Sequence, residues 1–359
     1  MKLRPVEVVH GVAASVVAIA RTCVSFRPLI VAVLAAAYAI WRTGLSWTPD
    51  FDVFWVAAAH HSGPVYDSAY LTALQSGPGE RPFPYPPTFL LMILPLAFLP
   101  MKAAYVVWVT ISSITLVEVG AKLSRLSWVV LLCPLATIAG LMGQTTFFTA
   151  ALIYGAFVVQ SQIVAGCLLG VAACIKPQVM ILIPLIWILE RRWTAIWSML
   201  GTAAALCLSA TLAFGPSKWL DWLSALPHFI ALNNKMDVPR LGLPLPLNLV
   251  AGLAAVALVV RAVRDHNRPR ALFAAIAGAL LLSPHSPRYE AVDTFIPAMA
   301  AVGLSWQIAP VIVLLMFPPG AAAFAVTALL IGIPNRLSLP AKAEAPTGSP
   351  STGSSAVSS

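Results

Sequence analysis

The sequence predicts an all-α polytopic membrane protein. Of the 359 residues, 59% are hydrophobic and only 10% are charged. Soluble domains carry about 25% charged residues, so this composition excludes a soluble globular protein. A membrane-spanning helix needs roughly 20 apolar residues, and the chain has room for about 11–13 such helices joined by short loops.

The charges around the first apolar run predict which side of the membrane each loop faces. The run Leu29–Trp47 is preceded by four basic residues and one acidic residue, whereas the following loop, 48–84, carries four acidic residues against one arginine. Cytoplasmic loops are enriched in lysine and arginine. We therefore expect residues 1–28 to be a retained cytoplasmic or interfacial segment and loop 48–84 to lie outside.

Later charges divide the rest of the chain in the same way. Glu190-Arg191-Arg192 and the basic stretch 261–270 are predicted to be cytoplasmic, which leaves 215–244 and 283–290 on the outer side. The transmembrane domain is expected over 29–333. The tail, 334–359, is rich in Ser, Thr, Gly and Pro and is expected to be disordered.

Further apolar segments fill the space between these loops. Pro177 divides one of them, so that it forms either one kinked helix or two short ones. The segments are 86–101, 103–119, 128–142, 145–160, 163–189, 194–214, 245–260, 271–283, 291–307 and 309–333.

Several functional classes are disfavoured. The five cysteines form no Cys-x-x-Cys pair or Cys/His cluster, so neither a disulfide framework nor a zinc site is indicated. The net charge of +9 fits cytoplasmic loops rather than nucleic-acid binding. No metal and no cofactor is expected.

Asp50 is the first candidate for chemistry. It follows the first apolar run directly, where a carboxylate is well placed to act as a general base on a substrate that enters from the lipid. The alternative is that Asp50 caps the next helix. Asp50-Phe51-Asp52 also spells the Asp-x-Asp pattern that holds metals in nucleotide-sugar enzymes. Asp52 is the second candidate for the base.

Lys176 lies deep inside the apolar segment 163–189. A lysine there costs roughly 2.5–3.5 kcal/mol on insertion scales, so it should have an anionic partner. Snorkelling to the membrane surface is the alternative, but both ends of the segment are far away. We therefore expect Lys176 to have a functional role.

The outer segment 283–290 brings His, Arg and Glu together between two apolar runs. Arg288 is a candidate for holding a phosphate, and His285 for orienting it or sharing a proton. His60, Tyr85 and Gln144 are candidate substrate-binding residues. Alternatively, His60 is simply solvated, Tyr85 belongs to a stiff proline-rich segment that leads into the bilayer, and Gln144 belongs to a short turn.

The outer segment 215–244 predicts an amphipathic helix on the membrane surface. Trp219, Trp222, Leu223 and Leu226 recur at helical spacing. Asn233-Asn234-Lys235-Met236 is expected to be a polar loop after it.

Taken in order, these features resemble a known family. The motifs are Asp50-Phe51-Asp52-Val53-Phe54-Trp55-Val56-Ala57, Gly63-Pro64-Val65-Tyr66-Asp67, the proline-rich stretch from Phe83 to Pro100, Gly143-Gln144, Lys176-Pro177-Gln178, Arg191-Arg192-Trp193 and Phe214-Gly215-Pro216. The pattern, over residues 48–300, is similar to glycosyltransferase family 87, the polyprenyl-phosphate-mannose-dependent mannosyltransferases. The chain departs from the family at Pro287-Arg288-Tyr289-Glu290, where members often carry Tyr-Asp-Tyr-Asp or a His-bearing version.

The resemblance implies a C-type glycosyltransferase bundle with short outer-side helices, in a bacterial inner membrane. Such enzymes invert the anomeric carbon as they move a sugar, by default mannose, from a polyprenyl-phosphate donor to a hydroxyl of a lipid or glycan acceptor. They work on the periplasmic side. Carried over by motif, Asp50 is the base, and Lys176, Arg288 and His285 bind the donor phosphate. Its partners are therefore the lipid-linked donor, the acceptor and membrane lipids, with no nucleic acid.

Two other classes remain open. A transporter or flippase for a lipid-linked sugar needs the same membrane cavity and cations, but no catalytic carboxylate. A membrane scaffold without enzymatic activity would leave Lys176 without a purpose.

Overall fold

The computed structural model describes residues 30–31, 33–35, 37–38, 40–41, 49–77, 79–235, 245–283, 286–303, 310–311 and 321–333. Within these ranges all regular elements are helices, and none is a strand, as the composition predicts. The expected segments 1–28 and 334–359, and most of the first span Leu29–Trp47, lie outside the described residues.

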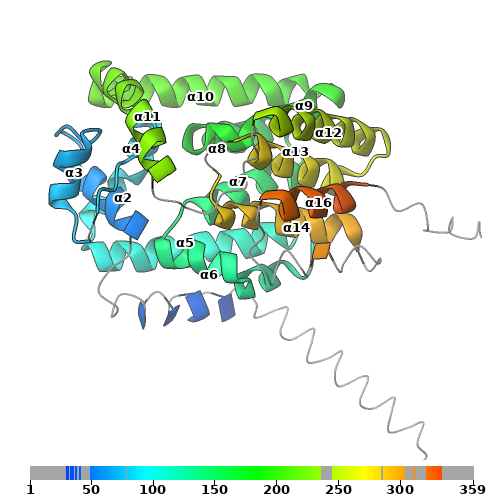
Figure 1. Ribbon diagram of the computed structural model, residues 1–359, viewed down its shortest axis with the longest axis horizontal. Helices are drawn as coiled ribbons and strands as arrows, with labels where there is room; N and C mark the ends of the chain where they lie inside the picture. The colour runs from blue at the N-terminus through cyan, green and yellow to red at the C-terminus, as the bar shows by residue number, and fades with distance from the viewer. Residues whose placement is uncertain are drawn as a thin grey trace, which may run out of the picture.

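Three helices in the described part are long and apolar enough to cross a membrane. They are α5 (Met101–Gly120), α10 (Trp193–Phe214) and α12 (Leu245–Arg264). Figure 1 shows α10 along the top and α5 along the bottom of the molecule, with shorter helices between them. Their length fits an apolar layer of about 30 Å, because an α-helix rises about 1.5 Å per residue.

Other apolar segments in the described part form shorter helices, several of them in pairs that meet at a break. The 11–13 spans predicted from the composition refer to the whole chain, and that number stays a prediction. α6 (Pro134–Met142) and α7 (Thr146–Val158) meet at 114° and count as a fourth span if taken together. α8 (Gln162–Ile175) breaks at Lys176-Pro177 into the turn η3 (Pro177–Met180) and α9 (Ile183–Leu189). The proline therefore ends one helix and begins another, since it cannot donate a hydrogen bond.

A third pair is α13 (Arg268–Leu282) and α14 (Val292–Val302), with η4 (Arg288–Ala291) between them. The spans expected over 271–283 and 291–307 correspond to these two helices. Broken helices leave backbone polar groups unpaired, and inside a membrane such breaks occur where protein or water surrounds them. A functional site is therefore expected at the three breaks.

α8 and α10 pack closely along their length. Gly166 and Gly170, four residues apart on α8, face α10, and a Cβ atom on either would clash with the α10 backbone. Small residues at this spacing let two helices approach within a membrane, where dispersion contacts drive association. This pairing fixes α8, and with it the position of Lys176.

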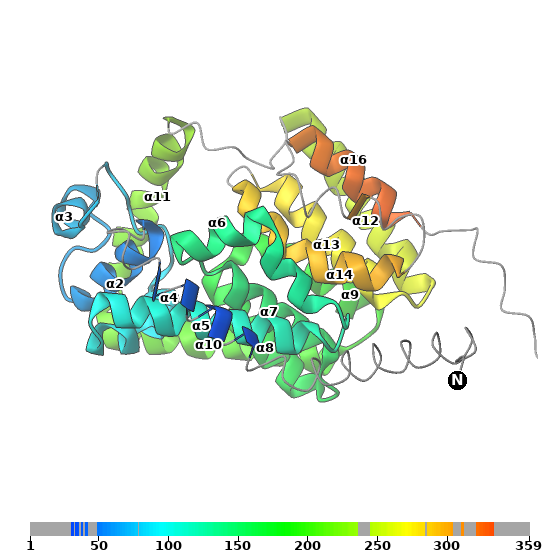
Figure 2. The same ribbon diagram turned by 90° about the horizontal axis from the view of Figure 1, so that it is seen from below.

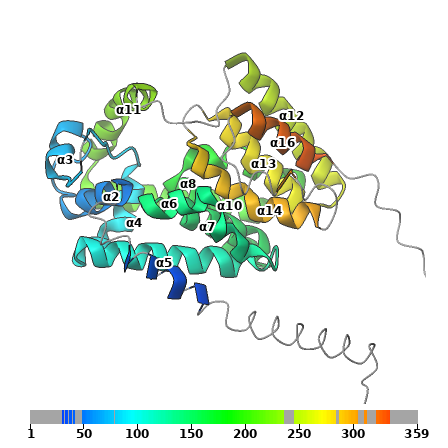
Figure 3. The same cartoon turned by 60° about the horizontal axis from the view of Figure 1, so that its bottom comes forward.

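Short helices gather at one end of the molecule. α2 (Pro49–Ala59), α3 (Ser68–Leu74), α4 (Pro87–Ile93), η1 (Leu94–Phe98) and the amphipathic α11 (Ser217–Lys235) lie there. In Figure 3, α2, α3 and α11 lie at one side, away from α12 and α14. Asn233-Asn234-Lys235, expected in a loop, instead form the last turn of α11, and the following residues lie outside the described part.

The opposite end is basic. Arg268 bonds Glu190 through Nε at 2.7 Å, which places the α9–α10 and α12–α13 connections together. Lys122 and Arg125 follow the last turn of α5, and Figure 2 shows α12, α13, α14 and α16 (Ala321–Gly332) filling the half away from α2 and α3. The basic loops that the sequence predicts to be cytoplasmic therefore lie at one end of the fold, and the acidic loop 48–84 lies at the other.

Candidate active site

Asp50 stands in the first turn of α2, at the end of the molecule where the short helices gather. The next residue, Phe51, is fully buried and packs edge-on against Tyr105 of α5, with ring centroids 5.4 Å apart. This packing fixes the helix start, so that the Asp50 carboxylate meets Gln144, whose Nε2 donates a hydrogen bond to Asp50 Oδ2. Burial raises the pKa of Asp50 above its ordinary value, and the Gln144 bond and the charges of Arg81 and Lys176 oppose the rise.

Gln144 is presented by a turn with little freedom. Gly143, which ends α6, has φ = +68°, a conformation that favours glycine. A Cβ atom there would lie 2.5 Å from the Phe51 Cβ, so the turn presses against α2. Trp108 Nε1 donates to the Gly143 carbonyl at 3.0 Å. The short turn predicted as an alternative is thus present, and it also positions Gln144.

Tyr85 reaches the same turn from the proline-rich segment before α4. Its hydroxyl donates to Gln144 Oε1 at 3.4 Å and lies 3.3 Å from Thr145 Oγ1. Its ring is held against Phe89, with centroids 4.5 Å apart, and Phe54. Gln144 is therefore bonded on both sides, to Asp50 through its nitrogen and to Tyr85 through its oxygen.

Lys176 lies at the break after α8 and is 2% exposed. Its Nζ donates to Glu290 Oε1 of η4 at 3.0 Å and to Thr146 Oγ1 of α7 at 3.2 Å. The anionic partner expected for this buried lysine is Glu290. One ammonium group therefore joins the breaks of all three helix pairs.

Asp293 is the residue that sequence reasoning missed. It lies on α14, is fully buried, and interacts electrostatically with Lys176 and Glu290. Among the described residues neither of its carboxyl oxygens has a hydrogen-bond partner, whereas its backbone carbonyl accepts from Tyr154 Oη at 2.7 Å. A single acidic residue within an apolar run was the available signal, since ionisable residues within membranes are usually functional.

Asp52 points elsewhere. Its Oδ2 accepts from the Ser76 N–H at 3.0 Å and from Arg81 Nη2 at 3.4 Å, and the side chain is buried. Residues two apart on a helix do not face each other. The Asp-x-Asp pattern thus directs Asp50 and Asp52 to different partners, and does not present both carboxylates to one cation.

The other candidates are less closely tied to this group. Arg288 belongs to the same turn as Glu290, and its buried Nε has no hydrogen-bond partner among the residues that the structure describes. His285 lies outside the described residues. His60 follows the last turn of α2, roughly 15 Å along the helix from Asp50.

These contacts define the network: Asp50, Gln144 and Tyr85 on one side, Lys176, Glu290 and Asp293 on the other, joined through Thr145 and Thr146. Residues 83–284 match the family model for glycosyltransferase family 87, which is more than half of the chain. The chain belongs to glycosyltransferase family 87. No curated protein and no solved structure matches it.

The family assignment gives the network its chemical meaning. The matched stretch contains Tyr85, Gln144 and Lys176, whereas Asp50 and Glu290 lie outside it and are brought to these residues by the fold. A glycosyl transfer needs a group that takes the proton of the acceptor hydroxyl and groups that stabilise the leaving group. A carboxylate and an ammonium at opposite ends of one network offer both.

Proposed function

We propose that this glycosyltransferase moves a sugar, mannose by default, from a polyprenyl-phosphate carrier to a hydroxyl of a lipid or glycan acceptor. The observation that carries the proposal is the connection of the Asp50 carboxylate to the Lys176 ammonium through residues 144–146. All regular elements among the described residues are helices, and only 10% of the chain is charged, which supports a lipid-linked donor over a nucleotide-sugar bound by a soluble domain.

The reaction is an inverting displacement in one step. Asp50 takes the proton of the acceptor hydroxyl as the hydroxyl oxygen bonds to the anomeric carbon. The bond from this carbon to the phosphate oxygen breaks, and its electron pair leaves with the polyprenyl phosphate. A phosphate leaving group is already ionised, so it needs cations rather than a general acid.

Lys176 is the cation that we assign to the donor phosphate. In the structure it is bonded to Glu290, and Asp293 interacts with it electrostatically. A phosphate would compete with Glu290 for the ammonium. Arg288, whose Nε lacks a partner in the described part, is the second cation of the same turn.

Gln144 orients the base. Because its oxygen accepts from Tyr85, its nitrogen is directed at Asp50. This bond holds the carboxylate in one position while a second oxygen remains for the acceptor.

On this proposal the reaction takes place on the outer, periplasmic face of a bacterial inner membrane. The charge distribution supports this side, because Asp50 lies at the end opposite the basic connections near Glu190 and Arg268. A lipid-linked donor and the membrane lipids around it supply the remaining partners.

The donor class is tested with purified protein in detergent. Radiolabelled polyprenyl-phosphate mannose is expected to give labelled product with a suitable lipid acceptor, whereas GDP-mannose alone gives none. Robust transfer from GDP-mannose would contradict the proposal. A flippase would instead move the labelled lipid across vesicles without breaking its sugar–phosphate bond.

A further inference from the structure

A cavity lies beside α5 and α6, and Arg125 at one of its ends is far along α5 from Asp50. It has a volume of about 660 Å³ and is lined by the described residues of 30–38 together with α5, η2 (Ser127–Leu132), α6 and Phe147. This volume is within the range of about 300–1,000 Å³ that small-molecule sites have. The volume of the cavity does not indicate the chemistry of a ligand, whereas the positions of its polar side chains do.

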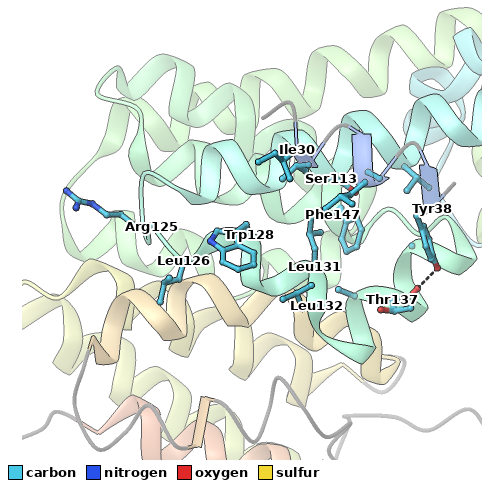
Figure 4. A pocket seen from close by; sticks show the side chains of 16 residues that line it. Ile30, Tyr38, Ser113, Arg125, Leu126, Trp128, Leu131, Leu132, Thr137 and Phe147 are labelled. Carbon is cyan, nitrogen blue, oxygen red and sulfur yellow. Dashed lines mark hydrogen bonds between the residues drawn. The ribbon is translucent and has the colours of Figure 1, made fainter. Parts of the chain in front are cut away.

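The cavity has polar groups at its two ends. Figure 4 shows Arg125 at one end and the Tyr38–Thr137 pair at the other; Ser113 and mainly apolar side chains, among them Leu131, Leu132 and Phe147, lie between them. Tyr38 Oη donates to the Thr137 carbonyl at 3.2 Å, so the groups at that end satisfy each other. The shape suits one hydrocarbon chain.

Arg125 is different. Its side chain is exposed, lines the cavity, and has no hydrogen bond or ion pair with any residue that the structure describes. It belongs to the turn after α5, at the basic end of the molecule, and the neighbouring Trp128 is 43% exposed. Arginine and tryptophan at this depth are typical of the level of the lipid headgroups.

We infer that this cavity binds one chain of an anionic phospholipid, with the headgroup phosphate on Arg125. The apolar lining buries the chain, and the guanidinium group provides a charge that matches phosphate. The lipid belongs to the leaflet at the basic end. This site is independent of the proposed reaction.

The position of Arg125 separates this lipid from a glycosyl donor. Phe51, next to Asp50, packs against Tyr105, and the helix from Tyr105 to Gly120 alone spans about 22 Å. Arg125 lies beyond Gly120. A lipid with its phosphate on Arg125 therefore cannot place the same phosphate at Lys176, close to Asp50.

The test uses quenching of Trp128 by lipids with brominated chains. Protein in phosphatidylcholine nanodiscs is titrated with brominated phosphatidylglycerol or brominated phosphatidylcholine, and the Trp128→Phe variant identifies the signal of Trp128. We expect phosphatidylglycerol to quench this signal at about fivefold lower mole fraction, the worth of one basic residue at an anionic surface. Arg125→Gln should remove the preference.

Lys122→Gln is the matched control, because Lys122 is an exposed cation of the same turn that does not line the cavity. It should retain the preference. Native mass spectrometry of the wild-type protein provides a measurement that needs no variant, and should show one retained phosphatidylglycerol. Equal quenching by the two lipids, an unchanged preference in Arg125→Gln, or displacement of phosphatidylglycerol by polyprenyl phosphate would overturn the inference.

Discussion

The Asp50 carboxylate combines two properties that a general base needs: one fixed hydrogen bond and a raised pKa. Gln144 supplies the bond, and burial raises the pKa. A carboxylate with a raised pKa holds a proton more strongly, which makes it a better base for an alcohol once it is ionised.

At the residue scale, this predicts the acid side of the pH profile. Asp50 works deprotonated, so kcat/KM should fall with decreasing pH at a higher pH than an ordinary aspartate, with its pKa of about 3.9, would give. Gln144→Leu removes a bond that lowers the pKa and should move this limb to higher pH. An unchanged limb in Gln144→Leu would argue against Asp50 as the titrating group.

The same shift affects stability with a defined sign. The folded protein binds the Asp50 proton more strongly than the unfolded chain does, because its pKa is raised on folding. The contribution of Asp50 to stability is therefore full below the ordinary pKa of the carboxyl group, and is lost as the pH rises through the folded-state pKa.

At the scale of elements, the turn between α6 and α7 controls the distance between Asp50 and Gln144. Gly143→Ala places a methyl group against Phe51 in a backbone conformation that alanine rarely adopts. We expect a tenfold or larger loss of turnover, because small misplacements near the reacting groups are costly. Steady-state kinetics and thermal melting measure the two effects separately.

Gly140→Ala is the matched control for this turn. Gly140 is a buried glycine of α6 with helical geometry, and the atoms nearest to an added Cβ lie at 3.6 Å, an ordinary contact. Activity should be nearly unchanged. Equal losses in the two variants would show that the turn has no special role.

The three helix breaks depend on one ion pair. Lys176→Met should lower the free energy of unfolding by about 3–5 kcal/mol, because Glu290 and Asp293 would remain buried without their cation. Lys176→Met combined with Glu290→Gln should recover much of the melting temperature but not the activity. Recovery of both would indicate that Lys176 has only a structural role.

At the scale of the whole molecule, the composition predicted the helical class and the positions of charged residues predicted a basic end. The hydropathy pattern did not predict which apolar runs form one long helix and which form a bent pair. The all-helical class is confirmed by the structure, and of the two alternatives at Pro177 the structure has two short helices. In the described residues three helices, or four with the bent pair, are long enough to cross a membrane, because apolar runs of similar length form both long helices and bent pairs, and hydropathy does not distinguish the two.

The site could be predicted only in part for a related reason. Asp50, Gln144 and Lys176 stand out locally as polar residues beside or within apolar runs. Their connections do not, since Gln144 is 94 positions from Asp50 and Glu290 is 114 positions from Lys176. Asp293 went unnoticed because it lies three residues beyond the candidate segment 283–290, inside the apolar run that follows.

The two ends of the fold predict which side of the membrane each residue faces. In a variant without native cysteines, Ser224→Cys on the exposed face of α11 should react with a membrane-impermeant maleimide in intact cells. Asp265→Cys, exposed at the basic end, should react only after permeabilisation. The reverse labelling pattern would place Asp50 on the cytoplasmic side.

The most direct test of the central claim is the rate of sugar transfer by Asp50→Asn from a polyprenyl-phosphate donor. Asparagine caps a helix as well as aspartate does, so the α2 start should be preserved. Catalysis by Asp50 predicts a fall in rate of roughly 10²–10⁴, with melting and donor binding retained. Asp52→Asn, which weakens only the contacts to Arg81 and Ser76, should be the milder change in rate. If Asp50→Asn keeps most of its activity while Asp52→Asn abolishes it, Asp50 is not the base.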